Sequence, residues 1–253
     1  MGSSTLRRLL YLSACLPFLL EACVKDSTES LKPPPLPDQS FVEEFDTVTA
    51  AYDRGWRYLN VSDPKGTGIW VQAMFNNPTI TGLPGPIPFP AYSSRGTYVG
   101  FIGADFTSTS AAAGVISNWI VSPVVSMQNG DRIIFYTRTV LYPLSGGDST
   151  DYANRLQVRI STSNESLNVG SGDDAGDFNT TLLDINPFSK EAHVIPYVPD
   201  AYPIRWTRFE ATIGGLNGAT KGRFAFRYYL DGAGSNGLGS GVAVDSVAYV
   251  GKR

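Results

Sequence analysis

The chain is 253 residues long, with 20 lysine and arginine residues, 23 aspartate and glutamate residues and a formal net charge of −3 at pH 7. This mild acidity provides no basic face for a nucleic acid, so we expect no nucleic-acid partner. The chain has one histidine and two cysteines, which excludes zinc sites that are built from several histidines or from a cluster of thiolates.

Residues 1–22 have the pattern of a signal peptide. Arg7 and Arg8 precede the apolar run 9–20, and a small residue stands before Cys23. The run is shorter than the roughly 20 apolar residues that a membrane-spanning helix needs. The segment resembles the lipobox of bacterial lipoproteins, which implies a lipid on the thiol of Cys23 and a location at the outer membrane or cell surface. Glu21 departs from the usual small or apolar residue, and a secretory signal that is cut at another bond is the alternative.

Residues 23–39 are predicted to be a flexible linker that begins with the lipidated cysteine. The first part is polar, and the proline-rich residues 33–37 favour an extended polyproline conformation, so we expect a tether between a membrane and a domain. Lys25-Asp26, with Glu29 nearby, loosely resembles the charged signal that sends some Bacteroidetes lipoproteins to the outer face of the outer membrane. A linker that is merely soluble is the alternative.

Residues 40–253 contain one predicted strand after another. In 154–161, Leu156, Val158 and Ile160 alternate with polar residues, which is the period of two of a half-buried strand. Alternation, or enrichment in aromatic and β-branched residues, predicts further strands at 131–140, 205–213, 223–229 and 242–250. No stretch has sustained helical periodicity. We therefore predict one all-β domain, an antiparallel two-sheet jelly-roll sandwich, preceded by the signal peptide and the proline-rich tether.

Motifs spread over residues 41–250 resemble those of a known family. In chain order they are Glu43-Glu44-Phe45-Asp46, Gly55-Trp56, Ser117-Asn118-Trp119-Ile120-Val121-Ser122-Pro123, Phe135-Tyr136-Thr137-Arg138-Thr139, Arg155–Ser161, Gly176-Asp177-Phe178, Leu183–Pro187, Gly222–Tyr228 and Val244-Asp245-Ser246-Val247. The set resembles the choice-of-anchor J or cleaved-adhesin domains, which are relatives of the MAM-type jelly rolls. The resemblance implies an exported, non-catalytic binding or adhesion module, often with structural calcium, and it implies no particular ligand.

Four side chains are candidate calcium ligands. Glu44 and Asp46 lie on the first strand pattern and Asp245 on the last, and we expect these strands to be neighbours, so that the oxygens can converge. Asn236, in the loop 231–240, could add a further oxygen, because Ca²⁺ binds six to eight of them. Both cysteines precede the domain, so no disulfide can stabilise it, whereas a bound ion could. The alternative is that Asp46 and Asp245 cap turns or pair with an arginine.

A glycan-binding face is the second hypothesis, because sugars stack on aromatic rings and form hydrogen bonds with planar polar groups. The candidates are aromatic residues expected in loops or at strand edges, and arginines on strands whose other face is apolar: Trp70, Tyr92, Tyr197, Tyr202, Trp206, Arg138, Arg155, Arg159 and Arg227. The alternative is that the rings pack in the core and that the arginines form cross-strand salt bridges. The proline-rich loop 76–90 is the favoured binding element.

The sequence offers little support for catalysis. A Ser-His-Asp triad would need His193, and no Gly-x-Ser-x-Gly sequence occurs to partner it, so we interpret His193 as an ordinary loop residue. Glycoside hydrolysis needs two carboxyl groups about 5–10 Å apart, and no motif singles out any of the available acids, Glu165, Asp184, Glu191 and Glu210. We predict a lipoprotein that is not an enzyme and that binds an extracellular glycan or a surface protein. A structural or assembly subunit of an envelope complex is the alternative, and a glycoside hydrolase is the third hypothesis.

Overall fold

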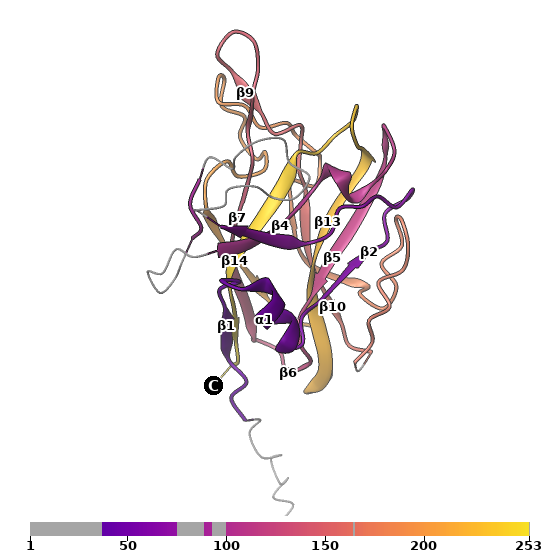
Figure 1. Ribbon diagram of the computed structural model, residues 1–253. Helices are drawn as coiled ribbons and strands as arrows, with labels where there is room; N and C mark the ends of the chain where they lie inside the picture. Colours follow the sequence, from indigo (N-terminus) through magenta and orange to yellow (C-terminus); the bar gives the residue numbers. More distant parts are fainter. Residues whose placement is uncertain (1–36, 75–88, 93–99, 164, 253) are drawn as a thin grey trace, which may run out of the picture. The chain divides into compact units, whose positions relative to one another are not determined.

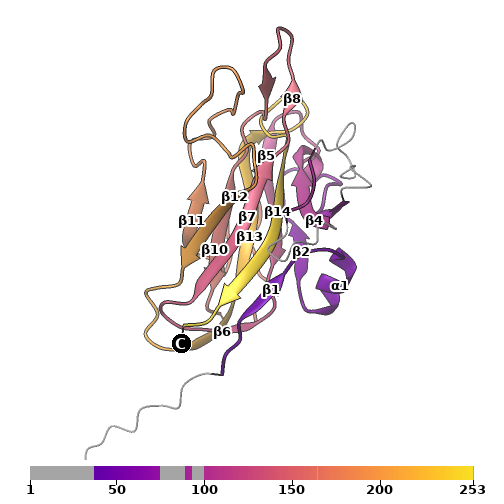
Figure 2. The same ribbon diagram turned by 90° about the vertical axis from the view of Figure 1, so that its left-hand side faces the viewer.

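The computed structural model describes residues 37–74, 89–92, 100–163 and 165–252. The chain divides into two compact units, Met1–Pro35 and Leu36–Arg253, and all described residues belong to the second. Residues 1–22, the predicted signal peptide, and Cys23, the predicted lipidation site, therefore lie outside the described residues. Within the second unit two antiparallel sheets face each other, which confirms the predicted all-β jelly-roll sandwich (Figures 1 and 2).

The first sheet is built around the last strand of the chain. Its strands follow the order β12 (Thr207–Thr212), β7 (Arg132–Thr139), β14 (Gly241–Val250), β4 (Gly100–Asp105), β3 (Val71–Met74), and β1 (Phe41–Glu43) also pairs with β14. Phe41 lies opposite Tyr249 in an antiparallel pair, so the prediction that the first and last strands are neighbours is confirmed.

The second sheet is built around the longest strand of the described chain. Its order is β11 (Thr180–Ile185), β10 (Leu156–Ser161), β13 (Thr220–Ala233), β5 (Gly114–Val121), β2 (Arg57–Asn60), and β6 (Val125–Met127) also pairs with β13. A separate two-stranded hairpin is formed by β8 (Tyr142–Pro143) and β9 (Ser149–Thr150). Each of the five strands predicted from alternation and composition overlaps one of the observed strands, β7, β10, β12, β13 or β14.

The core lies between the two sheets and consists largely of aromatic and β-branched side chains. Successive residues of β7 alternate between partly exposed and buried, so Ile133 and Phe135 point into the core. The ring of Phe135 packs edge-on against Phe226 of the facing sheet, with centroids 4.8 Å apart. Each such side chain contributes about 1.5–3 kcal/mol when it is fully buried, which stabilises a domain that has no disulfide.

Two short helical segments interrupt the strands, α1 (Val48–Asp53) and the 3-10 turn η1 (Phe106–Ser108). Neither segment is predicted from the sequence, and α1 is too short to show a helical period, since it has six residues and an α-helix needs 3.6 residues per turn. Among the described residues, no helix is both long and apolar enough to cross a membrane.

The strand β14 runs between two different ends of the sandwich. At its last residues, the Gly251 N–H donates to the Ser40 hydroxyl oxygen over 2.9 Å, so the described chain begins and ends together; we call this the terminal end. At its first residue, the Gly241 N–H donates to the side chain of Asn154, among the connections that we call the loop end. Ten residues of strand separate the two ends by roughly 33 Å, and Figure 1 shows β9 on the side opposite to the C-terminus.

Candidate binding pocket at the loop end

The connection between β11 and β12, residues 186–206, forms a pocket at the loop end of the sandwich. Its middle is held by Asp148, which lies between β8 and β9 and whose Oδ2 is 2.8 Å from the Nδ1 of His193. Its last part is held by β7, because the Thr139 N–H donates to the carbonyl oxygen of Pro203 over 2.8 Å. Both attachments connect the loop to ordered structure, so its shape is largely set before any ligand binds.

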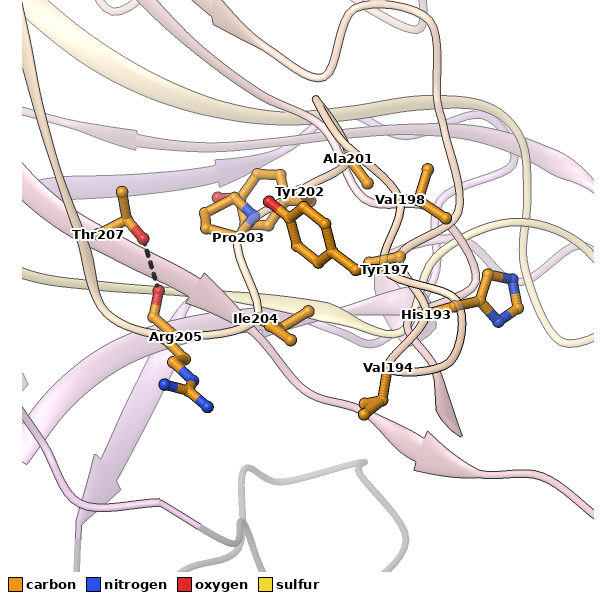
Figure 3. A pocket seen from close by; sticks show the side chains of 11 residues that line it. His193, Val194, Tyr197, Val198, Ala201, Tyr202, Pro203, Ile204, Arg205 and Thr207 are labelled. Atoms are coloured by element: carbon orange, nitrogen blue, oxygen red, sulfur yellow. Dashed lines mark hydrogen bonds between the residues drawn. The ribbon is translucent and has the colours of Figure 1, made fainter. Parts of the chain in front are cut away.

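We call the resulting cavity of about 390 Å³ the loop pocket (Figure 3). Figure 3 shows Tyr197 between Arg205 on one side and His193 on the other. The Thr207 hydroxyl donates to the carbonyl oxygen of Arg205 over 2.9 Å, which fixes the backbone from which the guanidinium extends. The lining residues are Ala192, His193, Val194, Tyr197, Val198, Ala201, Tyr202, Pro203, Ile204, Arg205 and Thr207.

Two of the predicted ligand-binding tyrosines lie together in the loop pocket, in different environments. The side chain of Tyr197 is 71% exposed, so its ring is available to a ligand. Tyr202 is buried, and its hydroxyl lies 2.6 Å from the hydroxyl of Thr137 in β7. Tyr202 therefore forms part of the pocket wall, whereas Tyr197 is the ring on which a ligand could stack.

Arg138 lies directly behind the loop pocket, on the outer face of the first sheet. Its Nη2 donates to the carbonyl oxygen of Ile204 over 2.7 Å, and its guanidinium carbon lies 3.6 Å from the centroid of the Phe89 ring. Tyr92 lies on the same outer face, but its ring stacks on Tyr136 at 3.6 Å and does not line the pocket.

The remaining predicted ligand contacts do not join this site. Trp70 is 0% exposed in the core between the sheets, so the expectation that it contacts a ligand needs correction. Arg159 is on β10 of the other sheet, where its Nε donates to the carbonyl oxygen of Phe178 over 2.7 Å. Of the favoured loop 76–90, residues 76–88 lie outside the described residues. Its last residue, Pro90, accepts a hydrogen bond of 2.8 Å from the indole N–H of Trp206.

Three of the four predicted calcium ligands lie near one another where β1 approaches β14, but Glu44 and Asp46 follow β1, which ends at Glu43, and do not lie on the strand as predicted. Asp245 is fully buried, its Oδ1 accepts a 2.8 Å hydrogen bond from the Ser246 N–H, and its Oδ2 has no hydrogen-bond partner among the described residues. Burial, and then the negative charges of Glu44 and Asp46, raise the pKa of Asp245 to about 9. Glu44 in turn accepts a hydrogen bond from the Ser246 hydroxyl.

The fourth predicted calcium ligand, Asn236, lies elsewhere, in a cavity at the loop end that Tyr142 and Tyr152 also line. Among the described residues, no group of three histidine, cysteine, aspartate or glutamate side chains is arranged to hold a metal ion. Calcium stays a prediction for Glu44, Asp46 and Asp245, because the unpartnered oxygen of Asp245 is the kind of hard donor that Ca²⁺ binds.

Two of the four acids that were considered for glycoside hydrolysis, Asp184 and Glu210, form ion pairs with arginines. Asp184 receives two hydrogen bonds from Arg155, of 2.8 and 2.6 Å, across the pair β10–β11. Glu210 forms ion pairs with Arg132 and Arg208. Arg132 and Glu210 form the cross-strand salt bridge that is the alternative role for a strand arginine, whereas Arg208 and Glu210 pair within β12.

Arg205 has no predicted functional role, and the alternating pattern predicts it to be the first residue of a strand. In the structure, β12 begins at Thr207, so Arg205 belongs to the loop and lines the pocket. The signal that could have found it is Pro203, because a proline close before a strand pattern often marks the end of a loop. The contact between His193 and Asp148 has no local signal, because the two residues are 45 positions apart.

The comparisons with known proteins found similar structures but no matching family or sequence. No family profile and no curated protein sequence matches the chain. The K1 cleaved adhesin domain of Lys-gingipain from Porphyromonas gingivalis is 16% identical, and the alignment covers 85% of this chain and 99% of that domain with a TM-score of 0.49. The K3 cleaved adhesin domain has the same identity and coverage and a TM-score of 0.47. A family 11 carbohydrate-binding module from Clostridium thermocellum, solved with a mixed-linked tetrasaccharide, is 11% identical over 86% of this chain and 98% of the module, with a TM-score of 0.37.

Proposed function

We propose that this chain is an exported, non-catalytic binding module that recognises a glycan through the loop pocket. The observation that carries the proposal is the exposed ring of Tyr197 in a cavity of about 390 Å³ that a guanidinium and an imidazole also line. Sugar rings present flat C–H faces that stack on aromatic side chains, and their hydroxyls need a few well-placed polar groups. The loop pocket offers both kinds of group.

The positions of the chain's entry point and of the loop pocket on the domain support a binding protein that is anchored through its N-terminus. The tether enters the domain at the terminal end, where Ser40 lies beside Gly251. The loop pocket lies at the opposite end of β14, because Pro203 is bonded to Thr139, which pairs with Val242. The loop pocket and the first described residues therefore lie at opposite ends of the domain.

A first prediction concerns the ring of Tyr197. We expect the substitution Tyr197→Ala to weaken glycan binding about 10-fold, because stacking on an aromatic ring contributes about 0.5–1.5 kcal/mol. We also expect the stability to change by less than about 0.5 kcal/mol, because the ring is exposed. The measurement is a glycan array followed by titration calorimetry, with Tyr58→Ala as the control, since Tyr58 is also exposed but lies on β2 of the other sheet. Equal affinity of both variants and the unchanged chain, or no bound glycan at all, would contradict the proposal.

A second prediction concerns the anchor. We expect cells that express the chain to incorporate radiolabelled palmitate into it, and we expect Cys23→Ala to abolish the label and to release the protein from the membrane fraction. A label that persists in the Cys23→Ala variant, or an unlabelled protein whose leader is cut at another bond, would show that the anchor prediction is wrong.

One observation favours a second candidate function, the structural or assembly subunit. The connection 186–206 carries three strongly exposed apolar residues, Phe188 at 82%, Ile195 at 66% and Tyr197 at 71%, and exposed apolar surface is common where proteins associate. A fixed envelope partner that co-purifies with the unchanged chain and is lost on Ile195→Asp, together with an empty glycan array, would favour this function. Release of reducing sugar from a bound glycan would instead favour a glycoside hydrolase.

A further inference from the structure

The charges around the loop pocket are distributed unevenly. Among its lining residues Arg205 is cationic, and no aspartate or glutamate is present. Two acids lie beside His193, where Asp148 Oδ2 is 2.8 Å from its Nδ1 and Glu191 is 3.8 Å from its Nε2. On the other side of Tyr197, the exposed guanidinium of Arg205 has no ion-pair partner within the part of the chain that the structure describes.

A second guanidinium lies close behind Arg205. Arg138 reaches the pocket wall through its hydrogen bond to the Ile204 carbonyl oxygen, and it also forms no ion pair with any of the described acids. Burial, and then the positive charge of Arg205, lower the pKa of Arg138 to about 10. Two like charges held together in this way repel each other, and an anion bound beside them would relieve the repulsion.

Other arginines of the first sheet are neutralised within the protein. Arg132 and Arg208 share the carboxylate of Glu210, at 3.2 and 2.5 Å. Two arginines that are close in the sequence therefore differ in their ion pairs. Arg208 on β12 pairs with Glu210, whereas Arg205, just before β12, forms no ion pair with a described residue. A planar guanidinium is well suited to bind the oxygens of a carboxylate or a sulfate with two parallel hydrogen bonds.

We propose that Arg205, with Arg138 behind it, forms an anion-binding subsite beside Tyr197, so that the ligand of the loop pocket is an acidic saccharide. This inference rests on the proposed function and names the class of glycan. The sugar ring stacks on Tyr197, and a carboxylate or sulfate group on the same or the next residue accepts hydrogen bonds from Arg205. The positive charge of Arg138 also attracts the bound anion. Because Arg138 is partly buried, solvent screens this attraction less than it would at the surface.

The test is titration calorimetry of the full chain, in detergent, with three probes. Oligogalacturonate carries a carboxylate on each residue, its fully methyl-esterified form has the same sugars without the charge, and a sulfated galactan oligomer carries sulfate instead. We expect at least one anionic probe to bind at least about 10-fold more tightly than the methyl ester, because hydrogen bonds to charged groups are the stronger ones. We also expect this advantage to fall with increasing salt.

The substitution Arg205→Gln should abolish the preference for the anionic probe, so that this probe binds the variant no more tightly than the methyl ester does. The matched control is Arg208→Gln, a nearby exposed arginine whose charge Glu210 already neutralises, and it should retain the preference. Equal binding of charged and methyl-esterified probes, or a preference that survives in Arg205→Gln, would overturn the anion subsite while leaving a glycan-binding function in place. If none of the probes binds and the glycan array is also empty, both proposals fail.

Discussion

Replacing Asn154 by alanine is expected to lower the free energy of unfolding by about 3–5 kcal/mol, because several buried groups lose their partner at once. The Asn154 side chain is 0% exposed. Its Nδ2 donates to the hydroxyls of Thr139 and Ser240, over 2.7 and 2.9 Å. Its Oδ1 accepts hydrogen bonds from the hydroxyl of Tyr228, over 2.8 Å, and from the backbone N–H of Gly241, over 3.1 Å.

The expected loss of stability is large because the hydrogen-bond partners of Asn154 are buried and cannot bond to water instead. A buried donor or acceptor without a partner costs about 1–3 kcal/mol, and alanine leaves a void that is enclosed on all sides. Asn154 also connects both sheets, since Thr139 is on β7 of the first and Tyr228 is on β13 of the second. Its loss therefore weakens the contact between the two layers at the loop end.

The measurement is urea-induced unfolding followed by circular dichroism. Asn179→Ala is the matched control, because Asn179 is exposed and its side chain accepts one hydrogen bond, from Thr180; we expect it to change the stability by less than about 0.5 kcal/mol. An equally small decrease in the free energy of unfolding for Asn154→Ala and Asn179→Ala would contradict the proposed role of the Asn154 side chain.

The backbone of Asn154 also contacts the connection 186–206 that forms the loop pocket. Its carbonyl oxygen accepts a 2.7 Å hydrogen bond from the side chain of Asn186.

The strands were predictable from local patterns, whereas the arrangement of the candidate site was not. Alternation places Leu156, Val158 and Ile160 on one face of β10, and all three are buried in the core. Local patterns do not distinguish Trp70 from Tyr197, because both are aromatic residues flanked by turns. The first is fully buried and the second is 71% exposed, a difference that depends on which distant segments pack against them.

The polar network at the loop end was not predictable for the same reason. Asn154 looks like the ordinary first residue of a strand pattern, and its partners Tyr228 and Ser240 are 74 and 86 positions away. The pairing of the first and last strands was predictable, and it brings Glu44 and Asp46 near Asp245, although the three side chains do not form a group arranged to hold a metal ion. The position of Asn236 was not, because it depends on how the β13–β14 connection folds back.

Replacing Asp245 by asparagine is expected to stabilise the protein at alkaline pH when no divalent ion is present. The ordinary pKa of an aspartate is about 3.9, and in the folded protein burial and the neighbouring acids raise that of Asp245 to about 9. Between these values the folded chain binds one more proton than the unfolded chain. The free energy of unfolding is therefore fully retained below about pH 4 and decreases as the pH rises toward about 9.

Asparagine has nearly the same shape and no charge, so Asp245→Asn removes this decrease. At pH 8 in EDTA we expect the variant to be more stable than the unchanged chain by about 2–4 kcal/mol, and below pH 4 we expect the two to be alike. The measurement is urea unfolding as a function of pH. Asp231→Asn is the control, because Asp231 is exposed on β13 and should leave the pH dependence unchanged.

Calcium reverses the expected effect of the same substitution. A bound Ca²⁺ favours the ionised carboxylate, so excess Ca²⁺ should raise the Tm of the unchanged chain, and a concentration of 100 Kd corresponds to about 2.7 kcal/mol. Asp245→Asn lacks the negative charge that attracts the ion and keeps one neutral side-chain oxygen, so its Tm should rise much less with Ca²⁺. A Tm that is the same in EDTA and in Ca²⁺ would show that the calcium prediction for Glu44, Asp46 and Asp245 is wrong. If Asp245→Asn is no more stable than the unchanged chain at pH 8 in EDTA, the argument that burial raises the pKa of Asp245 is wrong. The two tests are independent, because the first measures the effect of a metal ion on the Tm and the second measures the effect of a proton on the free energy of unfolding.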